Sequence, residues 1–148
     1  MSLNCYSPDA SYSPDVKGEQ LRVQFGDAVR ILAVTPHMDR RGRLVELDFA
    51  AVPFPVRRVF AVTHVPAGTN RGGHRHRSCS QLLICLAGRV DVELRKGRCR
   101  DGLAMTPGTG GLCIAAGIWA RQRYVVEGSE LLVLASEPFD PASYDSGY

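Results

Sequence analysis

Two histidines, His74 and His76, are the residues of this 148-residue chain whose type and spacing could do chemistry. Side chains two positions apart on a β-strand project from the same face, so both imidazoles should enter the same space. Imidazoles that converge inside a small barrel can bind a metal ion or move protons, because their ordinary pKa is about 6.5. The alternative is a pair of partly buried histidines with only a structural role.

The sequence around the pair follows the pattern Gly-x5-His-x-His-x4-Gln-x6-Gly, from Gly68 to Gly88. This spacing resembles the first motif of the cupin superfamily, in which a glutamate is usual at the position of Gln81. The second cupin motif normally supplies one more histidine, and its counterpart in residues 111–120 has Ala120 there. Two histidines and an amide are a poor ligand set for Fe, Mn or Zn. We therefore predict no bound metal and no other cofactor.

A longer run of residues resembles one group of cupins, the nucleoside-diphosphate-sugar 3,4-ketoisomerases that act on dTDP-4-keto-6-deoxyglucose. The signature of that group is Arg-Gly-x-His-Ala-His-Lys, then glutamine and a Cys-Leu-x-Gly turn. Residues 71–77, Gln81 and residues 85–88 match it, apart from Arg75 and Arg77. Further similarity is found in residues 39–44, 53–59, 111–119, 132–136 and 139–144. The resemblance therefore spans most of the chain, from Ile31 to Tyr144, in one consistent order.

This resemblance implies an antiparallel jelly-roll enzyme, usually a homodimer, that moves the carbonyl of a dTDP-4-keto-6-deoxyhexose from C4 to C3 without a metal. The reaction needs a base for the C3 proton, an acid that returns a proton at C4, and stabilisation of the enediolate between them. By the family match, His76 is the expected base and His74 the partner that shuttles protons or orients it. The expected substrate-binding residues are Arg71, Arg58, Gln81, Trp119, Arg121 and Arg123.

Several of these binding residues also have an ordinary structural interpretation. Trp119 could stack on thymine or sugar, or be a core residue. Arg121 and Arg123 alternate on one strand face, so they could complete a diphosphate site or face solvent. Arg71 could form bidentate hydrogen bonds to the diphosphate or the enediolate oxygen, or be a solvated loop charge.

Some positions differ from the residues that are usual in the ketoisomerases. Phe60 and Ala61 replace a tyrosine pair, Ala120 replaces a histidine, and Arg75 replaces an alanine. Two alternatives therefore stay open: a metal-dependent cupin enzyme that uses the two histidines, and a non-catalytic cupin that binds a sugar nucleotide. Tyr144, near the C-terminus, is expected to pack or cap rather than to react.

The elements that must position these residues are predicted to be short β-strands. Apolar runs separated by turn residues predict strands over Val29–Val34, Leu44–Phe49, Val59–Val65, Gln81–Ala87, Val90–Leu94, Leu112–Ala115, Arg121–Val126 and Glu130–Ser136. No window of 11 or more residues shows a convincing helical period. Asp140 could begin one short helical turn, because aspartate is a good N-cap. Eight or so short strands without helices between them imply a sandwich or barrel, so the predicted fold class is all-β.

The beginning of the chain differs from the rest. Residues 1–27 contain several turn signals in quick succession, so we expect a flexible or draped N-terminal extension. The cupin jelly-roll domain is then predicted to occupy residues 28–148.

Composition narrows the class of protein. With 45% hydrophobic and 22% charged residues, the chain is typical of one globular domain. There is no secretory signal and no apolar run near the roughly 20 residues that span a bilayer. The net charge is only +3, and no basic stripe with interleaved aromatic residues suggests nucleic-acid binding. Five scattered cysteines without a C-x-x-C pair suggest small buried hydrophobes in a reducing cytoplasm. We therefore expect a cytoplasmic protein whose partner is a small-molecule nucleotide sugar.

Overall fold

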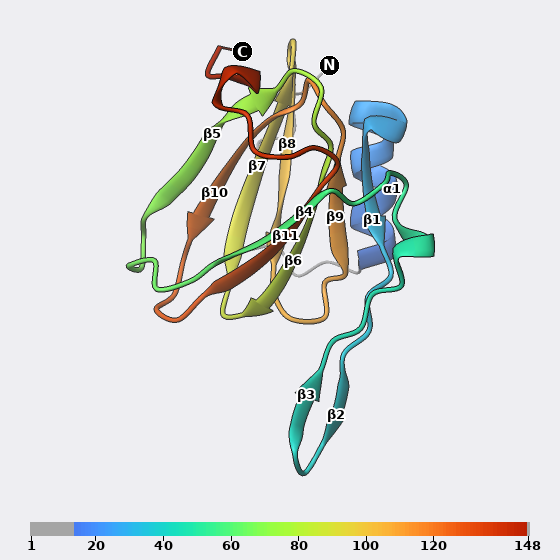
Figure 1. Cartoon of the computed structure of the whole chain (residues 1–148), viewed down its shortest axis with the longest axis vertical. Coiled ribbons are helices and arrows are strands. Elements are labelled where there is room, and N and C mark those ends of the chain that lie inside the picture. The colour runs from blue at the N-terminus through green and yellow to red at the C-terminus, as the bar shows by residue number, and fades with distance from the viewer. Residues whose placement is uncertain (1–13, 148) are drawn as a thin grey trace.

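The computed structural model describes residues 14–147 and contains two five-stranded antiparallel sheets that face each other (Figure 1). Their strand orders are β1-β9-β6-β11-β4 and β12-β5-β10-β7-β8. Inward-facing apolar side chains of both sheets form the main core, which includes Leu83, Val92, Leu94, Leu112 and Val133. The all-β jelly roll predicted from the sequence is therefore confirmed.

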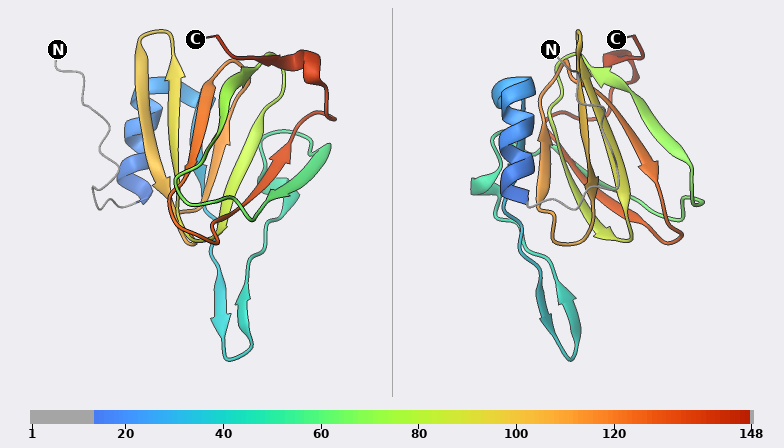
Figure 2. Two further views of the ribbon diagram at one scale, coloured as in Figure 1. Left: turned by 90° about the vertical axis from the view of Figure 1, so that its left-hand side faces the viewer. Right: turned by 180° about the vertical axis from the view of Figure 1, so that it is seen from behind.

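The two sheets and the smaller elements have the following bounds. The first sheet contains β1 (Val29–Leu32), β9 (Gly111–Ile114), β6 (Gln81–Ala87), β11 (Glu130–Ala135) and β4 (Arg58–Val62). The second contains β12 (Tyr144–Asp145), β5 (Asn70–His76), β10 (Trp119–Tyr124), β7 (Val90–Lys96) and β8 (Cys99–Met105). A hairpin of β2 (His37–Asp39) and β3 (Gly42–Leu44) projects away from both sheets (Figure 2). The 3-10 turns are η1 (Gly26–Ala28), η2 (Phe49–Ala51) and η3 (Pro141–Ser143).

One predicted strand, Leu44–Phe49, is wrong. Only Leu44 belongs to a strand, and residues 45–48 lead without pairing into η2, where the Asp48 side chain accepts a hydrogen bond from the Ala50 amide. Val45 and Leu47 are half-buried against the outer face of the first sheet. The alternating apolar residues thus belong to a loop that packs on the outer face of the sheet, and not to a strand of the sheet.

Helix α1 (Pro14–Phe25) also corrects the sequence analysis, which predicted no helix of this length. Its contribution to the main core is Leu21 and Phe25, one turn apart, which is too short a pattern to reveal a helical period. Lys17 donates to the Asp101 carboxylate at 2.6 Å and so joins the helix to β8. Residues 1–13 of the predicted extension, and Cys5 with them, lie outside the described residues.

Four cysteines lie in the described part of the chain, and all four are free thiols. Cys79, Cys85 and Cys113 are buried and Cys99 is half-buried, which agrees with their interpretation as small hydrophobes. Burial raises the pKa of the Cys85 thiol to about 11, so this group stays protonated at neutral pH. No helix within residues 14–147 is long and apolar enough to span a bilayer.

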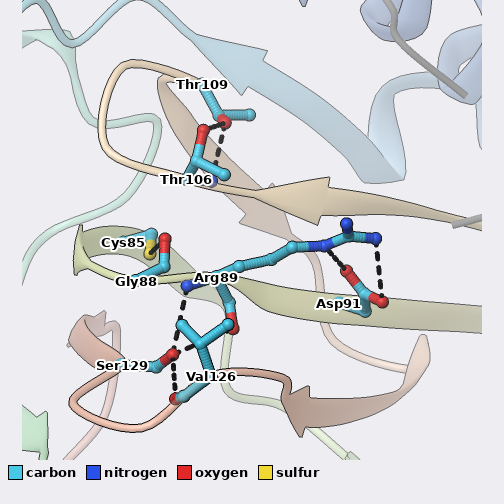
Figure 3. Close-up of polar contacts among 8 residues, drawn as sticks. All are labelled: Cys85, Gly88, Arg89, Asp91, Thr106, Thr109, Val126 and Ser129. Atoms are coloured by element: carbon cyan, nitrogen blue, oxygen red, sulfur yellow. Dashed lines mark hydrogen bonds and ion pairs between the residues drawn. The ribbon is translucent and has the colours of Figure 1, made fainter. Parts of the chain in front are cut away.

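Buried Ser129 joins two turns at one end of the sheets (Figure 3). Its hydroxyl donates to the Val126 carbonyl at 2.7 Å and accepts from the Arg89 amide at 3.1 Å. The Arg89 guanidinium in turn donates to Asp91 at 2.8 Å, so both the backbone amide and the side chain of Arg89 form hydrogen bonds. The serine hydroxyl therefore fixes the β6–β7 turn against the turn that precedes β11.

The Ser129→Ala variant is expected to lower the free energy of unfolding by about 1–3 kcal/mol, because the Arg89 amide loses its acceptor in a partly buried turn. Urea denaturation at neutral pH measures this change. The matched control is Ser146→Ala at an exposed position, which should change stability by less than about 0.5 kcal/mol. Equal, small effects of both substitutions would contradict the assigned role of the Ser129 hydroxyl.

Candidate active site

Strand β5 carries the two histidines on its inward face, as predicted from their spacing. The ring centroids of His74 and His76 lie 5.0 Å apart, with the ring planes at 83°. His76 is 8% exposed, and His74 is half-buried. The structure therefore brings both imidazoles into the same space between the sheets.

The histidine pair lines a small pocket of about 10 Å³. Its wall is formed by His74, His76, Cys79, Gln81, Ile114, Ala115, Ile118, Ala120 and Gln122. Gln81 comes from the facing sheet, so the predicted binding residue does lie with the histidines. Gln81 and Ala120 replace the carboxylate and the third histidine of the usual cupin metal site, and the remaining donors do not fit that ligand set. Within residues 14–147, no group of three or more His, Cys, Asp or Glu side chains is arranged to hold a metal ion.

A β-bulge in β5 places Arg71 on the same side of the sheet as His74. On β10, Ala120 pairs with His74 and Gln122 pairs with Arg71. The two β10 residues are two positions apart, whereas their partners on β5 are three positions apart, so β5 contains one extra residue here. Without the extra residue, the two β5 side chains would face opposite sides. Gly72 has a φ of 73°, and a Cβ atom there would lie 3.0 Å from the Ala120 carbonyl oxygen. The bulge therefore requires glycine, and it sets Arg71 at the exposed end of the cavity face.

The Gly72→Ala variant is expected to lose about 1–3 kcal/mol of stability, because an alanine at this positive φ is strained and also crowds β10. The control is Gly18→Ala within helix α1, where the new methyl group meets Ile31 at an ordinary 3.9 Å. That control should raise stability by about 0.5–1 kcal/mol, because glycine is unfavourable in a helix interior. Thermal unfolding measures both, and opposite signs are the expected result.

Tyr144 is a site residue that the sequence analysis did not identify. Its ring centroid lies 4.6 Å from both the His74 and the His76 ring. The tyrosine is on β12, where it is the direct partner of His76, and the neighbouring Asp145 accepts from Arg75 at 2.8 Å. Tyr144 does pack, as expected, but it packs against the two candidate catalytic rings. The similarity of residues 139–144 to the ketoisomerases was the one signal that pointed to it.

The turn before Tyr144 fixes where β12 begins. The Asp140 side chain accepts from the Ala142 amide at 2.9 Å and caps η3, which confirms the predicted short helical turn. The Ser143 carbonyl accepts from the Arg77 amide at 3.0 Å, which ties the turn to the end of β5. The tyrosine therefore follows directly on a capped and anchored turn.

Arg58, a predicted binding residue on β4, places a cation beside the histidines. Its guanidinium carbon lies 5.0 Å from the Phe60 ring centroid and 5.5 Å from that of Phe139. Its Nε is buried and has no hydrogen-bond partner among residues 14–147. A buried guanidinium N–H without an acceptor is suited to bind an anionic oxygen of a ligand.

Both histidines are neutral at pH 7. Burial, with smaller contributions from the charges of His74 and Arg58, lowers the pKa of His76 to about 4. Burial also lowers the pKa of His74, opposed in part by a hydrogen bond to the Gly72 backbone. A neutral imidazole can accept a proton, so the pair can act as bases at neutral pH.

Three predicted binding residues do not lie with the histidines. Trp119, Arg121 and Arg123 alternate along β10 with the residues that line the cavity, so they occupy the outer face of the second sheet. Trp119 is 5% exposed, with the Arg95 guanidinium 4.7 Å from its ring. Arg121 donates to Glu93 at 2.6 Å, and Arg123 is exposed. The structure therefore places Arg58, Arg71 and Gln81 on the same side as the histidines. The three β10 residues lie on the opposite face of the second sheet.

Comparison with known proteins adds an independent observation. Residues 27–148 match the family model described as FdtA, WxcM-like, C-terminal. A curated relative, the TDP-4-oxo-6-deoxy-alpha-D-glucose-3,4-oxoisomerase of Aneurinibacillus thermoaerophilus, is 28% identical over 112 residues, which are 75% of this chain and 81% of the relative.

Two solved structures are also similar to this chain. One is a histidine-to-asparagine variant of the 3,4-ketoisomerase QdtA from Thermoanaerobacterium thermosaccharolyticum, in complex with TDP-4-keto-6-deoxyglucose. It has a TM-score of 0.76 and 30% identity, covering 82% of this chain and 89% of that one. The other is the TDP-quinovose 3,4-ketoisomerase WlaRB of Campylobacter jejuni, with a TM-score of 0.74 and 31% identity, covering 82% and 95%.

Proposed function

The chain belongs to the FdtA family of WxcM-like, C-terminal domains, and we propose that it is a TDP-sugar 3,4-ketoisomerase. It moves the keto group of a TDP-4-keto-6-deoxyhexose between C4 and C3. The observation that carries this proposal is the pair of neutral imidazoles 5.0 Å apart in one cavity, with an unpaired guanidinium N–H beside them. That arrangement supplies a base and an anion-stabilising group, which a keto isomerisation requires.

His76 acts as the base that removes the C3 proton, which the C4 ketone makes acidic. Its lowered pKa keeps it neutral, so it can accept this proton at pH 7. His74 orients His76 or passes protons to it. Arg58 stabilises the negative charge on the enediolate oxygens, and Arg71 and Gln81 bind the substrate. Because Arg71 lies at the exposed end of the site, its guanidinium is suited to bind the diphosphate.

The proposal is tested by incubating the protein with TDP-4-keto-6-deoxyglucose in D₂O and following the sugar by NMR. The expected result is a 3-keto product with deuterium at C4, because the protonated base exchanges with solvent between the two steps. A protein that binds TDP but neither isomerises the sugar nor exchanges its C3 proton would be a non-catalytic nucleotide-sugar-binding cupin. Activity that depends on stoichiometric Fe, Mn or Zn would indicate the metal-dependent alternative.

We further propose that the protein is a cytoplasmic homodimer. The free thiols in the described part of the chain suit a reducing compartment. Exposed Phe49 and Val59 lie beside apolar residues of the first sheet, around a groove of about 500 Å³, which offers a surface for a second copy. Sedimentation velocity at micromolar concentration should give about twice the chain mass of 16.1 kDa. A monomer under those conditions would contradict the dimer.

A further inference from the structure

A 3,4-keto isomerisation moves protons on oxygen as well as on carbon. The substrate has C3–H, O3–H and a carbonyl at C4, whereas the product has a carbonyl at C3 and carries hydrogen on C4 and O4. One proton therefore leaves C3 and one arrives at C4, while another leaves O3 and one arrives at O4. The proposed function assigns the carbon-bound proton to His76. It leaves the transfer between the two oxygens without a residue.

The groups that line the cavity leave few candidates for that transfer. No carboxylate is among them, and the side-chain amides of Gln81 and Gln122 do not give up a proton near neutral pH. The Cys79 thiol points to a backbone carbonyl, that of Ser80, at 3.4 Å. Tyr144 is not part of this lining, but its ring centroid lies 4.6 Å from that of each histidine ring, and its phenol hydroxyl can both donate and accept a proton.

Tyr144 is also held in place, as a group that transfers protons must be. The β12–β5 pairing places it directly opposite His76, and the Asp145–Arg75 ion pair follows at the next position. The Phe139 ring lies 6.0 Å from the tyrosine ring on another side. The phenol therefore lies at the same edge of the second sheet as the base, on a strand that is held by these contacts.

We propose that Tyr144 is a further catalytic residue, which transfers a proton between O4 and O3 of the sugar; this inference rests on the proposed ketoisomerase function. As His76 takes the C3 proton, the C3–H electron pair forms the C3–C4 double bond. The C4 carbonyl pair moves to O4, which takes the Tyr144 proton. The phenolate then removes the O3 proton, C3 becomes the carbonyl, and C4 receives the proton held by His76. Both residues end as they began.

The Tyr144→Phe variant tests this role, because it keeps the ring that packs on the histidines and removes only the hydroxyl. We expect kcat for TDP-4-keto-6-deoxyglucose to fall about 100-fold or more. The Kd for TDP, measured by calorimetry, should stay within about threefold of wild type. The matched control is Tyr124→Phe, which removes the hydroxyl of the other tyrosine within residues 14–147, 1% exposed in the main core. Its kcat should stay within about threefold.

A second variant separates proton transfer from packing. Replacing Tyr144 with 3,5-difluorotyrosine keeps the ring and the hydroxyl but makes the phenol more acidic. The alkaline limb of the kcat–pH profile should then move to lower pH, whereas a purely structural tyrosine would leave it unmoved. An active wild type with an unmoved limb, or with near-wild-type kcat in Tyr144→Phe, overturns the role of Tyr144 alone. An inactive wild type overturns the ketoisomerase function, and the inference with it.

Discussion

The His76→Asn variant is expected to lose about 10²–10⁴-fold in isomerase activity, because asparagine keeps a hydrogen-bonding side chain but cannot take up a proton. TDP binding should be nearly unchanged, since His76 is buried beside the proposed sugar site and Arg71 marks the exposed end of the cavity face. NMR assays of turnover and calorimetry with TDP measure the two quantities separately. The same variant should also stop exchange of the C3 proton with D₂O.

The matched control is His64→Asn. His64 is an exposed histidine with a φ of 57°, a conformation that asparagine also adopts readily, so the backbone should be unaffected. Its activity should stay within about twofold of wild type. The His74→Asn variant should lie between the two, because asparagine can still orient a neighbour but cannot relay protons. Near-wild-type turnover in His76→Asn would move the role of base to His74.

The sequence predicted the fold best where burial follows strand periodicity. Strand β6 has the predicted bounds, because its run of buried residues is continuous and turns limit it on both sides. Helix α1 escaped prediction because the core takes only Leu21 and Phe25 from it, and their burial depends on β1 and β8 rather than on a local pattern. Local patterns therefore predicted the sheets, and tertiary contacts decided the elements that cover them.

In the candidate site, too, local patterns predicted some residues and tertiary contacts decided others. The convergence of His74 and His76 followed from their spacing alone, whereas Tyr144 joins them only through the β12–β5 pairing, which no local pattern encodes. For β10 the sequence did contain the decisive signal. If Ala120 occupies the position of an inward-facing cupin histidine, strand alternation sends Trp119 and Arg121 to the opposite face. The suitability of Arg121 for a diphosphate, and of Trp119 for stacking on thymine or sugar, had suggested the other placement.

The acid limb of kcat/KM is expected near pH 4 rather than near pH 6.5. Burial of His76, with smaller contributions from the charges of His74 and Arg58, lowers the pKa of this base to about 4. At pH 5 such a base is about 90% neutral, whereas a histidine with an ordinary pKa would be only about 3% neutral. The ratio of kcat/KM at pH 5 to that at pH 7 therefore distinguishes the two. A fall of about 25-fold, which an ordinary pKa would give, would contradict the lowered pKa.

The same pKa shift makes stability depend on pH. Between pH 6.5 and 4 the unfolded chain binds a proton at His76 that the folded protein does not, so the free energy of unfolding must fall as pH falls through this window. From pH 7 to pH 5 the contribution of this one group is about 2 kcal/mol. Urea denaturation of the wild type and of His76→Asn at both pH values isolates it, because the other titrating groups are common to both proteins. The wild type should lose about 2 kcal/mol more than the variant, since protonating His76 in the folded state would place a charge in a buried position beside Arg58.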